Sequence, residues 1–185
     1  QFLINSLVPN NNYLIDYLDI VKNLTSQKTN QYSIKMCELG LVSTLDALIN
    51  SLDEKKIDNA FYHKFINIIL ILASISSINM DIKNSIVDSN SLEKILDISI
   101  NYTKRAVIDK LIYFLFAYLL DLKENESSEA VYLAKFEKFF TFFDELYIKK
   151  DEPCIDVISI LKFFLVLTRI PSFIHHFDDE VQEKS

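Results

Sequence analysis

Glycine is nearly absent from this chain, which has one glycine, three prolines and no tryptophan among its 185 residues. Tight β-hairpins place glycine where φ is positive, so this composition leaves little material for a fold built from hairpins. It also leaves no glycine-rich phosphate loop, no dinucleotide-binding fingerprint and no nucleophile elbow. We therefore expect a helical protein that is not an enzyme.

Cysteine is scarce as well. Cys37 and Cys154 lie far apart in the sequence, and each has apolar neighbours. A disulfide-stabilised scaffold requires a much higher density of cysteine. We interpret both residues as buried free thiols, which indicates a reducing compartment inside the cell.

Apolar runs long enough to cross a bilayer are missing from the sequence. The longest runs, residues 65–73, 111–120 and 157–167, fall short of the ~18 residues that a membrane-spanning helix needs. Helices buried in a protein core explain these runs better, so we expect no contact with a membrane.

Positive charge is not in excess, because the formal net charge is −7. Nucleic-acid binding is dominated by contacts between cations and phosphates. The few basic pairs, such as Lys104–Arg105 and Lys149–Lys150, lie beside acidic residues or at breaks between expected helices. We expect no direct contact with nucleic acid, and a titration against duplex DNA at low salt tests this expectation.

Residue types that carry chemistry occur only in arrangements that a helix surface explains. His175 and His176 are adjacent, and neighbouring helix residues point about 100° apart, so these imidazoles cannot easily share a metal ion. His63 lies on an apolar segment, where a surface or hydrogen-bonded core histidine is the simpler interpretation. Carboxylate pairs such as Asp16 and Asp19 are typical of a solvated helix face. We expect no catalytic residue, no metal site and no cofactor.

Apolar residues at helical spacing are abundant, and they make up half of the chain. In residues 13–24, for example, the apolar positions from Tyr13 to Leu24 form one stripe along a helix. Helices are expected in residues 13–24, 31–39, 41–52, 58–75, 79–88, 89–100, 103–122, 130–148, 155–169 and 170–182.

Several of these segments follow a residue that can cap a helix. Capping side chains accept hydrogen bonds from the first backbone N–H groups of the helix. The single glycine, Gly40, separates residues 31–39 from 41–52, and a glycine inside a helix costs about 1 kcal/mol. We therefore expect Gly40 to be a joint with positive φ. The capping candidates are Asn11 or Asn12, Asp58, Asn79, and one of Ser89, Asn90 and Ser91.

The helical segments also recur in a short–medium–long order. An offset of 50 residues aligns apolar positions of two medium segments, and a further shift reaches the phenylalanines of a third. This spacing is near the ~40–47 residues of HEAT and armadillo units, in which we expect the glycine between the second helix and the third. The aligned positions are Val42 with Leu92, Leu45 with Ile95, Leu48 with Ile98, and then Phe136, Phe139 and Phe142.

The expected fold class is therefore all-α, a divergent HEAT/armadillo-like helical-repeat solenoid. A helical bundle without repeats is the alternative. We expect residues 1–185 to form a single helical-repeat domain or a fragment of a larger one. Its expected sub-units are residues 1–52, 53–101, 102–150 and 151–185.

Two segments, residues 13–51 and 66–99, resemble the start of the conserved C-terminal domain of WAPL (wings apart-like) proteins, which are cohesin-release factors. In that family, too, a short helix runs through a glycine into an apolar helix, and an Asn-Met-Asp element precedes a Ser-Leu-Glu helix. The matching positions in this chain are Gly40, Asn79, Met80, Asp81, Ser91, Leu92 and Glu93.

This resemblance implies a nuclear, HEAT-like domain without enzymatic activity. It implies as partners the cohesin subunits, including the ATPase head region, and the Pds-type accessory HEAT protein. We expect the third helices to line a concave groove for a partner, with Ser43, Thr44, Glu93 and Lys94 among its exposed positions. The alternative is a generic armadillo-like scaffold or adaptor from another pathway, such as trafficking, cell polarity or the kinetochore.

Overall fold

The computed structural model describes residues 1–27, 29–53, 57–89, 91–101, 110 and 114. Within these residues all regular structure is helical and none is β-strand, which confirms the all-α class for this part of the chain. Beyond residue 101 only residues 110 and 114 are described, both helical and within the helix expected in residues 103–122. The other helices expected there, together with Cys154, His175 and His176, lie outside the described residues. The helices are α1 (Phe2–Ser6), α2 (Leu14–Thr25), α3 (Gln31–Glu38), α4 (Leu41–Asn50), α5 (Asn59–Ser76), α6 (Met80–Asp88) and α7 (Ser91–Asn101).

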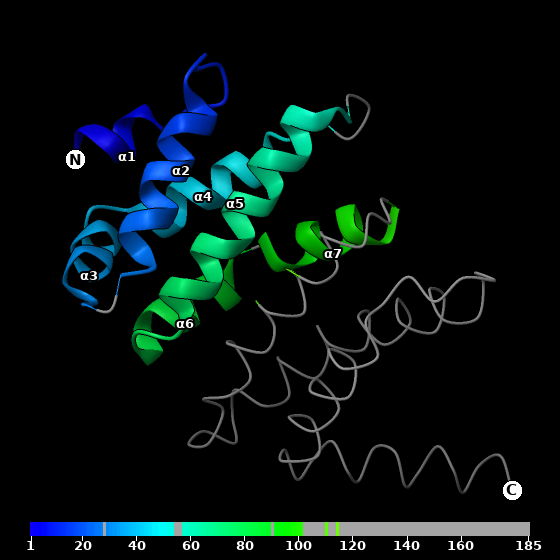
Figure 1. Cartoon of the computed structure of the whole chain (residues 1–185). Helices are drawn as coiled ribbons and strands as arrows, with labels where there is room; N and C mark the ends of the chain where they lie inside the picture. Colours follow the sequence, from blue (N-terminus) through cyan, green and yellow to red (C-terminus); the bar gives the residue numbers. More distant parts are fainter. Residues whose placement is uncertain (28, 54–56, 90, 102–109, 111–113, 115–185) are drawn as a thin grey trace, which may run out of the picture.

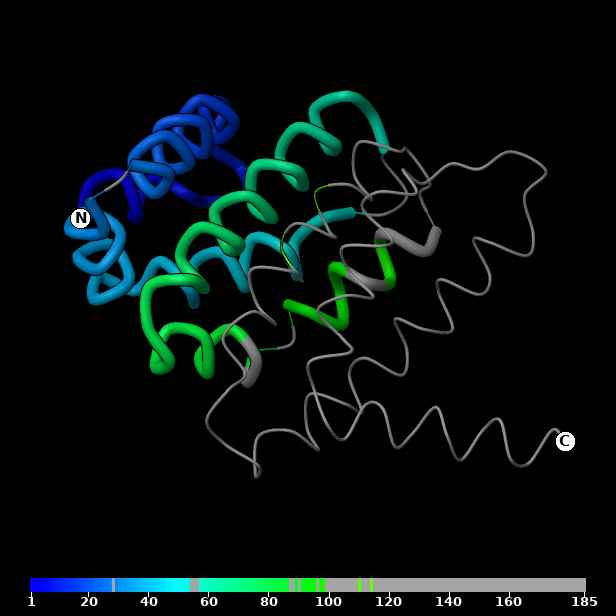
Figure 2. Tube along the Cα trace, turned by 60° about the horizontal axis from the view of Figure 1, so that its bottom comes forward, coloured from blue at the N-terminus to red at the C-terminus, as the bar shows by residue number. Residues whose placement is uncertain are grey.

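The long helix α5 is the centre of the described structure (Figures 1 and 2). It contacts α2, α3, α4 and α6, and its contact with α2 is the most extensive between any two helices described. A helix that is covered on several sides can be apolar around most of its circumference. This environment explains why residues 65–73 are almost continuously apolar.

By length and composition alone, α5 is long and apolar enough to cross a membrane. The apolar run 65–73 is too short to span a bilayer by itself, but the helix that contains it has 18 residues. However, 56% of the helix is buried inside the protein. Its packing against four other helices accounts for its composition without a bilayer.

Two of the expected helix caps are confirmed. The Asp58 carboxylate accepts a hydrogen bond from the backbone N–H of Phe61 at 2.7 Å, at the start of α5. The Asn79 side chain accepts one from the N–H of Ile82 at 2.9 Å, at the start of α6. Both residues have extended backbones, as N-cap residues do.

The cap expected at the start of α2 is wrong. Tyr13, and neither Asn11 nor Asn12, is the N-cap residue, and its side chain makes no capping hydrogen bond. The Asn11 side chain instead accepts a hydrogen bond from the N–H of Tyr13 at 3.0 Å, which forms a turn just before the helix. Tyr13 itself is 65% exposed, although the periodicity placed it on the inward stripe.

Gly40 is the expected joint, with a φ of 91° in the left-handed region. Its N–H donates to the carbonyl of Cys37, and its own carbonyl accepts from the N–H of Thr44, each at 3.0 Å. The chain thereby leaves α3 and enters α4 within two residues, Leu39 and Gly40. Gly40 thus lies between α3 and α4, the second and third of the helices expected in residues 1–52.

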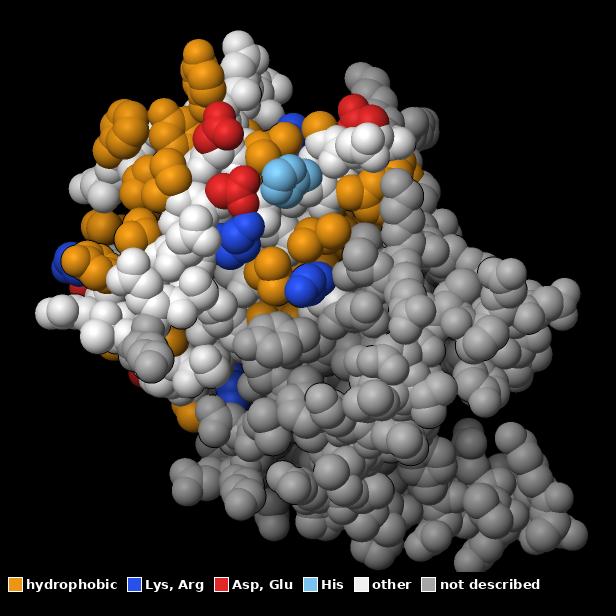
Figure 3. All heavy atoms as spheres, viewed as in Figure 1, with side chains coloured by type: hydrophobic (Ala, Val, Ile, Leu, Met, Phe, Trp, Pro, Cys, Tyr) orange, Lys and Arg blue, Asp and Glu red, His pale blue; other side chains and the backbone are white. Residues whose placement is uncertain are grey.

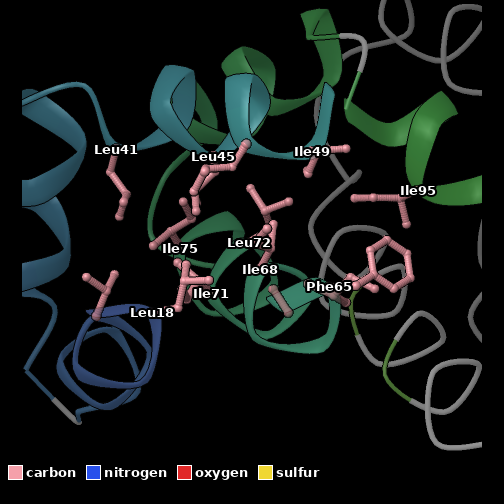
Figure 4. Close-up of a cluster of buried hydrophobic side chains, with 14 of the residues drawn as sticks. Leu18, Leu41, Leu45, Ile49, Phe65, Ile68, Ile71, Leu72, Ile75 and Ile95 are labelled. Carbon is pink, nitrogen blue, oxygen red and sulfur yellow. The ribbon is translucent and has the colours of Figure 1, made fainter. Parts of the chain in front are cut away.

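Helices far apart in sequence lie side by side in two layers. The long helix α5 packs against α2, and the medium helix α4 packs against α7. Between them lies one core, in which side chains from α4 and α7 meet those of α5 (Figure 4). Of the aligned medium-helix positions that the structure describes, Val42 is half-buried and the others are buried, namely Leu45, Leu48, Leu92, Ile95 and Ile98. Phe136, Phe139 and Phe142 lie outside the described residues.

Candidate functional site

A surface cleft of about 650 Å³ lies between α3, α4 and α6. We call it the α3–α6 cleft. It exists because the turn at Gly40 directs α4 away from α3, while the Asn79 cap fixes where α6 begins. Twelve described residues line it: Ile34, Cys37, Glu38, Gly40, Val42, Ser43, Asp46, Asn79, Asp81, Ile82, Ser85 and Ser89.

The apolar part of the α3–α6 cleft comes from all three helices. It consists of Ile34 and Cys37 on α3, Val42 on α4 and Ile82 on α6. Ile34 is 39% exposed, which is a large apolar surface for a residue inside a cleft. A ligand that covered it would gain hydrophobic free energy.

Acidic side chains accompany these apolar residues. They are Glu38 on α3, Asp46 on α4 and Asp81 in the first turn of α6. Glu38 forms an exposed ion pair with Lys35, with 2.8 Å between Nζ and Oε2. Asp46 accepts a hydrogen bond from the hydroxyl of Ser91 at 2.5 Å, which joins α4 to the first residue of α7.

Cys37 is a free, half-buried thiol, so the expectation of a free cysteine is confirmed at this position. Burial raises the pKa of this thiol to about 11, because a thiolate is poorly solvated there. The thiolate is the nucleophilic and metal-binding form of cysteine. At neutral pH the sulfur is therefore an apolar lining atom.

The structure divides the four expected partner-binding residues between two helices. Ser43 and Thr44 lie in the first turn of α4, and their hydroxyls donate to the carbonyl of Gly40, each at 2.9 Å. Glu93 and Lys94 are half-buried near the start of α7. All four lie on the medium helices α4 and α7, and the concave groove that they were expected to line stays a prediction.

Ser43 is the one member of this set that lines the α3–α6 cleft. Ser43 and Thr44 together also line a second hollow, of about 470 Å³, between α1 and α4. The packing of α4 against α7 brings the two pairs onto neighbouring helices. The described cavities do not unite all four residues in a single site.

A polar network on α2 and α5 was missed by the sequence interpretation. The Lys22 ammonium donates to Asp19 and, at 2.9 Å, to the side chain of Asn67, which in turn donates to Asp19 at 3.2 Å. His63 Nε2 lies 3.5 Å from Asp19 Oδ2. Figure 3 shows acidic, basic and histidine side chains meeting on this face.

The network has a recognisable signal in the sequence. Asn67 is a single polar residue within a strongly apolar run and is only 1% exposed, and a buried amide needs hydrogen-bond partners. The hydrogen bond from Lys22 holds the pKa of Asp19 below its ordinary value. His63 is half exposed, as expected of a surface histidine.

Within the described ranges, no three His, Cys, Asp or Glu residues come together in a way that could hold a metal ion. Comparisons with known proteins add no assignment. No protein-family model, no curated protein and no solved structure matches this chain.

Proposed function

We propose that this chain is a non-catalytic protein–protein interaction domain built from stacked three-helix units of the HEAT/armadillo type. One observation carries the proposal: two pairs of helices that are separated in the sequence pack against each other, α2 against α5 and the medium helix α4 against the medium helix α7. We assign α2 to the same place in its unit as the long helix α5. In a helical solenoid each unit contacts its neighbours, so corresponding helices form continuous layers.

On this proposal, α3, α4 and α5 form one unit, which spans residues 31–76 and so divides the chain differently from the expected sub-units 1–52 and 53–101. Helix α2 is then the long helix of the preceding unit, while α6 and α7 begin the next. The shared burial of Leu45 and Ile95 at aligned positions supports the same division. Stacked helical units present extended surfaces on which a partner protein can lie.

We further propose that the partner is cohesin, and that the domain belongs to a nuclear, WAPL-like regulator that promotes release of cohesin from chromatin. This part rests on the resemblance of residues 13–51 and 66–99. The residues that match the family lie at the Gly40 joint, at the Asn79 cap with the first turn of α6, and in the first turn of α7. These positions have structural roles of their own, so they support the fold more directly than the partner.

A pull-down with purified cohesin subunits and the Pds-type accessory protein tests the partner. We expect the wild-type chain to capture them, and the double variant Glu93→Ala/Lys94→Ala to capture less. A matched control, Asp16→Ala/Lys64→Ala, removes one acid and one base from α2 and α5. Melting curves of both variants verify that they remain folded.

Each outcome has a defined meaning. Absence of capture by the wild-type chain would overturn the cohesin assignment. Affinity purification from cells would then identify the partner of an adaptor from another pathway. Equal capture by both double variants would show that Glu93 and Lys94 do not belong to the binding surface. A titration with duplex DNA should show little binding, because the chain has a net charge of −7. Low salt makes this test most sensitive, since phosphate-driven binding is strongest there.

A further inference from the structure

We propose that the α3–α6 cleft binds a short cationic peptide segment of a partner protein, with an apolar side chain on Ile34, Val42 and Ile82 and a lysine or arginine at the acidic rim. The inference rests on the proposed function only in that the peptide belongs to a protein partner. It assigns a site and a ligand chemistry that the resemblance does not supply.

The size and lining of the cleft suit a peptide side chain. Its volume of about 650 Å³ lies within the roughly 300–1,000 Å³ that is usual for ligand pockets. Ile34 already presents 39% of its surface to solvent. Covering this surface gives an apolar anchor a favourable free energy that a purely polar ligand would not gain.

The charge of the cleft selects a cation. Among the twelve described lining residues, none is lysine or arginine, whereas Glu38, Asp46 and Asp81 are acidic. The ion pair with the nearby Lys35 compensates Glu38, which leaves Asp46 and Asp81 to set the sign of the local charge. A negative rim repels nucleic acids and other anions and attracts basic segments.

Most hydrogen-bonding groups of the cleft favour a ligand that is rich in donors, although the amide NH2 of Asn79, whose oxygen caps α6, is itself a donor. The hydroxyl of Ser43 donates to the carbonyl of Gly40, and the hydroxyl of Ser85 donates to the carbonyl of Asp81, each at 2.9 Å. Their protons are thus committed to their own helices, so their oxygens can only accept. Carboxylates are likewise acceptors. Ammonium, guanidinium and peptide N–H groups complement such a surface.

A metal ion fits this cleft less well than a peptide. The three carboxylates come from three different helices, and no group of three potential ligands converges anywhere in the described part of the chain. A side chain that combines an aliphatic stem with a cationic head can contact the floor and the rim together.

The test uses the full chain and a short fluorescent peptide made of arginine, leucine, serine and alanine. Binding is followed by fluorescence anisotropy. Two matched peptides replace every arginine by glutamine or every leucine by alanine. We expect the parent peptide to bind and each replacement to weaken binding, since charge and apolar contact both contribute.

Variants of the protein locate the binding. Asp81→Asn should weaken it about twofold to fivefold, as expected for the loss of an ion pair at an exposed carboxylate. The control Asp16→Asn changes an exposed acid in the first turn of α2, the same type of position. Likewise, Ile34→Asp should abolish binding, whereas Ile20→Asp changes an equally exposed isoleucine on α2 and should not.

A second readout is independent of these variants. In a Cys154→Ser chain, bound peptide should slow the reaction of Cys37 with a maleimide, because Cys37 lines the cleft. Failure of the parent peptide to bind, equal effects of Asp81→Asn and Asp16→Asn, or no protection of Cys37 would each overturn the inference. The proposed function would survive such a result if the wild-type chain and the Asp81→Asn chain both still captured cohesin subunits.

Discussion

Lys22 on α2 and Asn67 on α5 are 45 residues apart in sequence, and the Lys22 ammonium donates a hydrogen bond to the Asn67 side chain at 2.9 Å. Asn67 also donates to Asp19, one turn before Lys22 on the same helix. The buried amide therefore joins the two charged residues of α2 to the centre of α5. This contact reinforces the most extensive helix pair that the structure describes.

The first prediction concerns Asn67. Replacing it by alanine should lower the free energy of unfolding by about 1–3 kcal/mol, because the variant loses two charge-assisted hydrogen bonds and leaves space in the core. Asn67→Leu should be less damaging, since it refills the space and leaves Asp19 and Lys22 paired with each other. Urea denaturation measures both. Equal stability of wild type and Asn67→Ala would show that the two hydrogen bonds of Asn67 contribute nothing to the free energy of unfolding.

The second prediction is a dependence of stability on pH. The pKa of Asp19 is lowered in the folded protein from an ordinary value of 3.8. A lowered carboxyl pKa stabilises the fold above the unfolded-state pKa, and this stabilisation is lost as pH falls through the lower folded-state pKa. Asp19→Asn should therefore be less stable than wild type at neutral pH.

The difference in stability between wild type and Asp19→Asn should shrink only below about pH 4, where Asp19 of the unfolded chain begins to take up a proton while Asp19 of the folded protein is still ionised. Urea denaturation of both proteins from neutral to acidic pH measures it, and the subtraction removes the effects of other carboxylates. A difference that stayed constant through the acidic range would mean that the pKa of Asp19 is not lowered.

The third prediction concerns the joint at Gly40. An added Cβ would lie 3.4 Å from the hydroxyl of Ser43, an ordinary contact, so space does not forbid a side chain. The positive φ disfavours a side chain, because an ordinary residue in this left-handed conformation loses roughly 1–2 kcal/mol of stability. Gly40→Val should therefore destabilise most, Gly40→Ala less, and Gly40→Asn least, because asparagine tolerates this region. An unchanged melting temperature for Gly40→Val would contradict the left-handed joint.

The fourth prediction concerns the reactivity of Cys37. Because burial raises its pKa to about 11, almost none of it is thiolate at neutral pH. In a Cys154→Ser chain, alkylation by iodoacetamide should be slow at pH 7 and rise about tenfold per pH unit until it approaches that value. A rate that levelled off near pH 8 or 9 would indicate an ordinary, solvated thiol.

Local signals in the sequence determined the described helices from α2 to α7 and the caps of α5 and α6, whereas they gave neither α1 nor the cap of α2. Gly40 marks a joint because its backbone alone needs a positive φ there, and Asp58 and Asn79 cap helices because each bonds a backbone N–H three residues away. Such interactions stay within about one helical turn. The helical spacing likewise placed Leu45 and Ile95 in the core, since burial needs only that one side of each helix be covered.

Only the tertiary structure decided which helices are neighbours. The bond between Asp46 and Ser91 and the network around Asn67 each join residues about 45 positions apart, and helical spacing carries no information about such distances. Packing also left Tyr13 exposed, although the adjacent Leu14 at the start of α2 is buried. The α3–α6 cleft likewise arises from the relative placement of three helices, which depends on how all their apolar faces share one core.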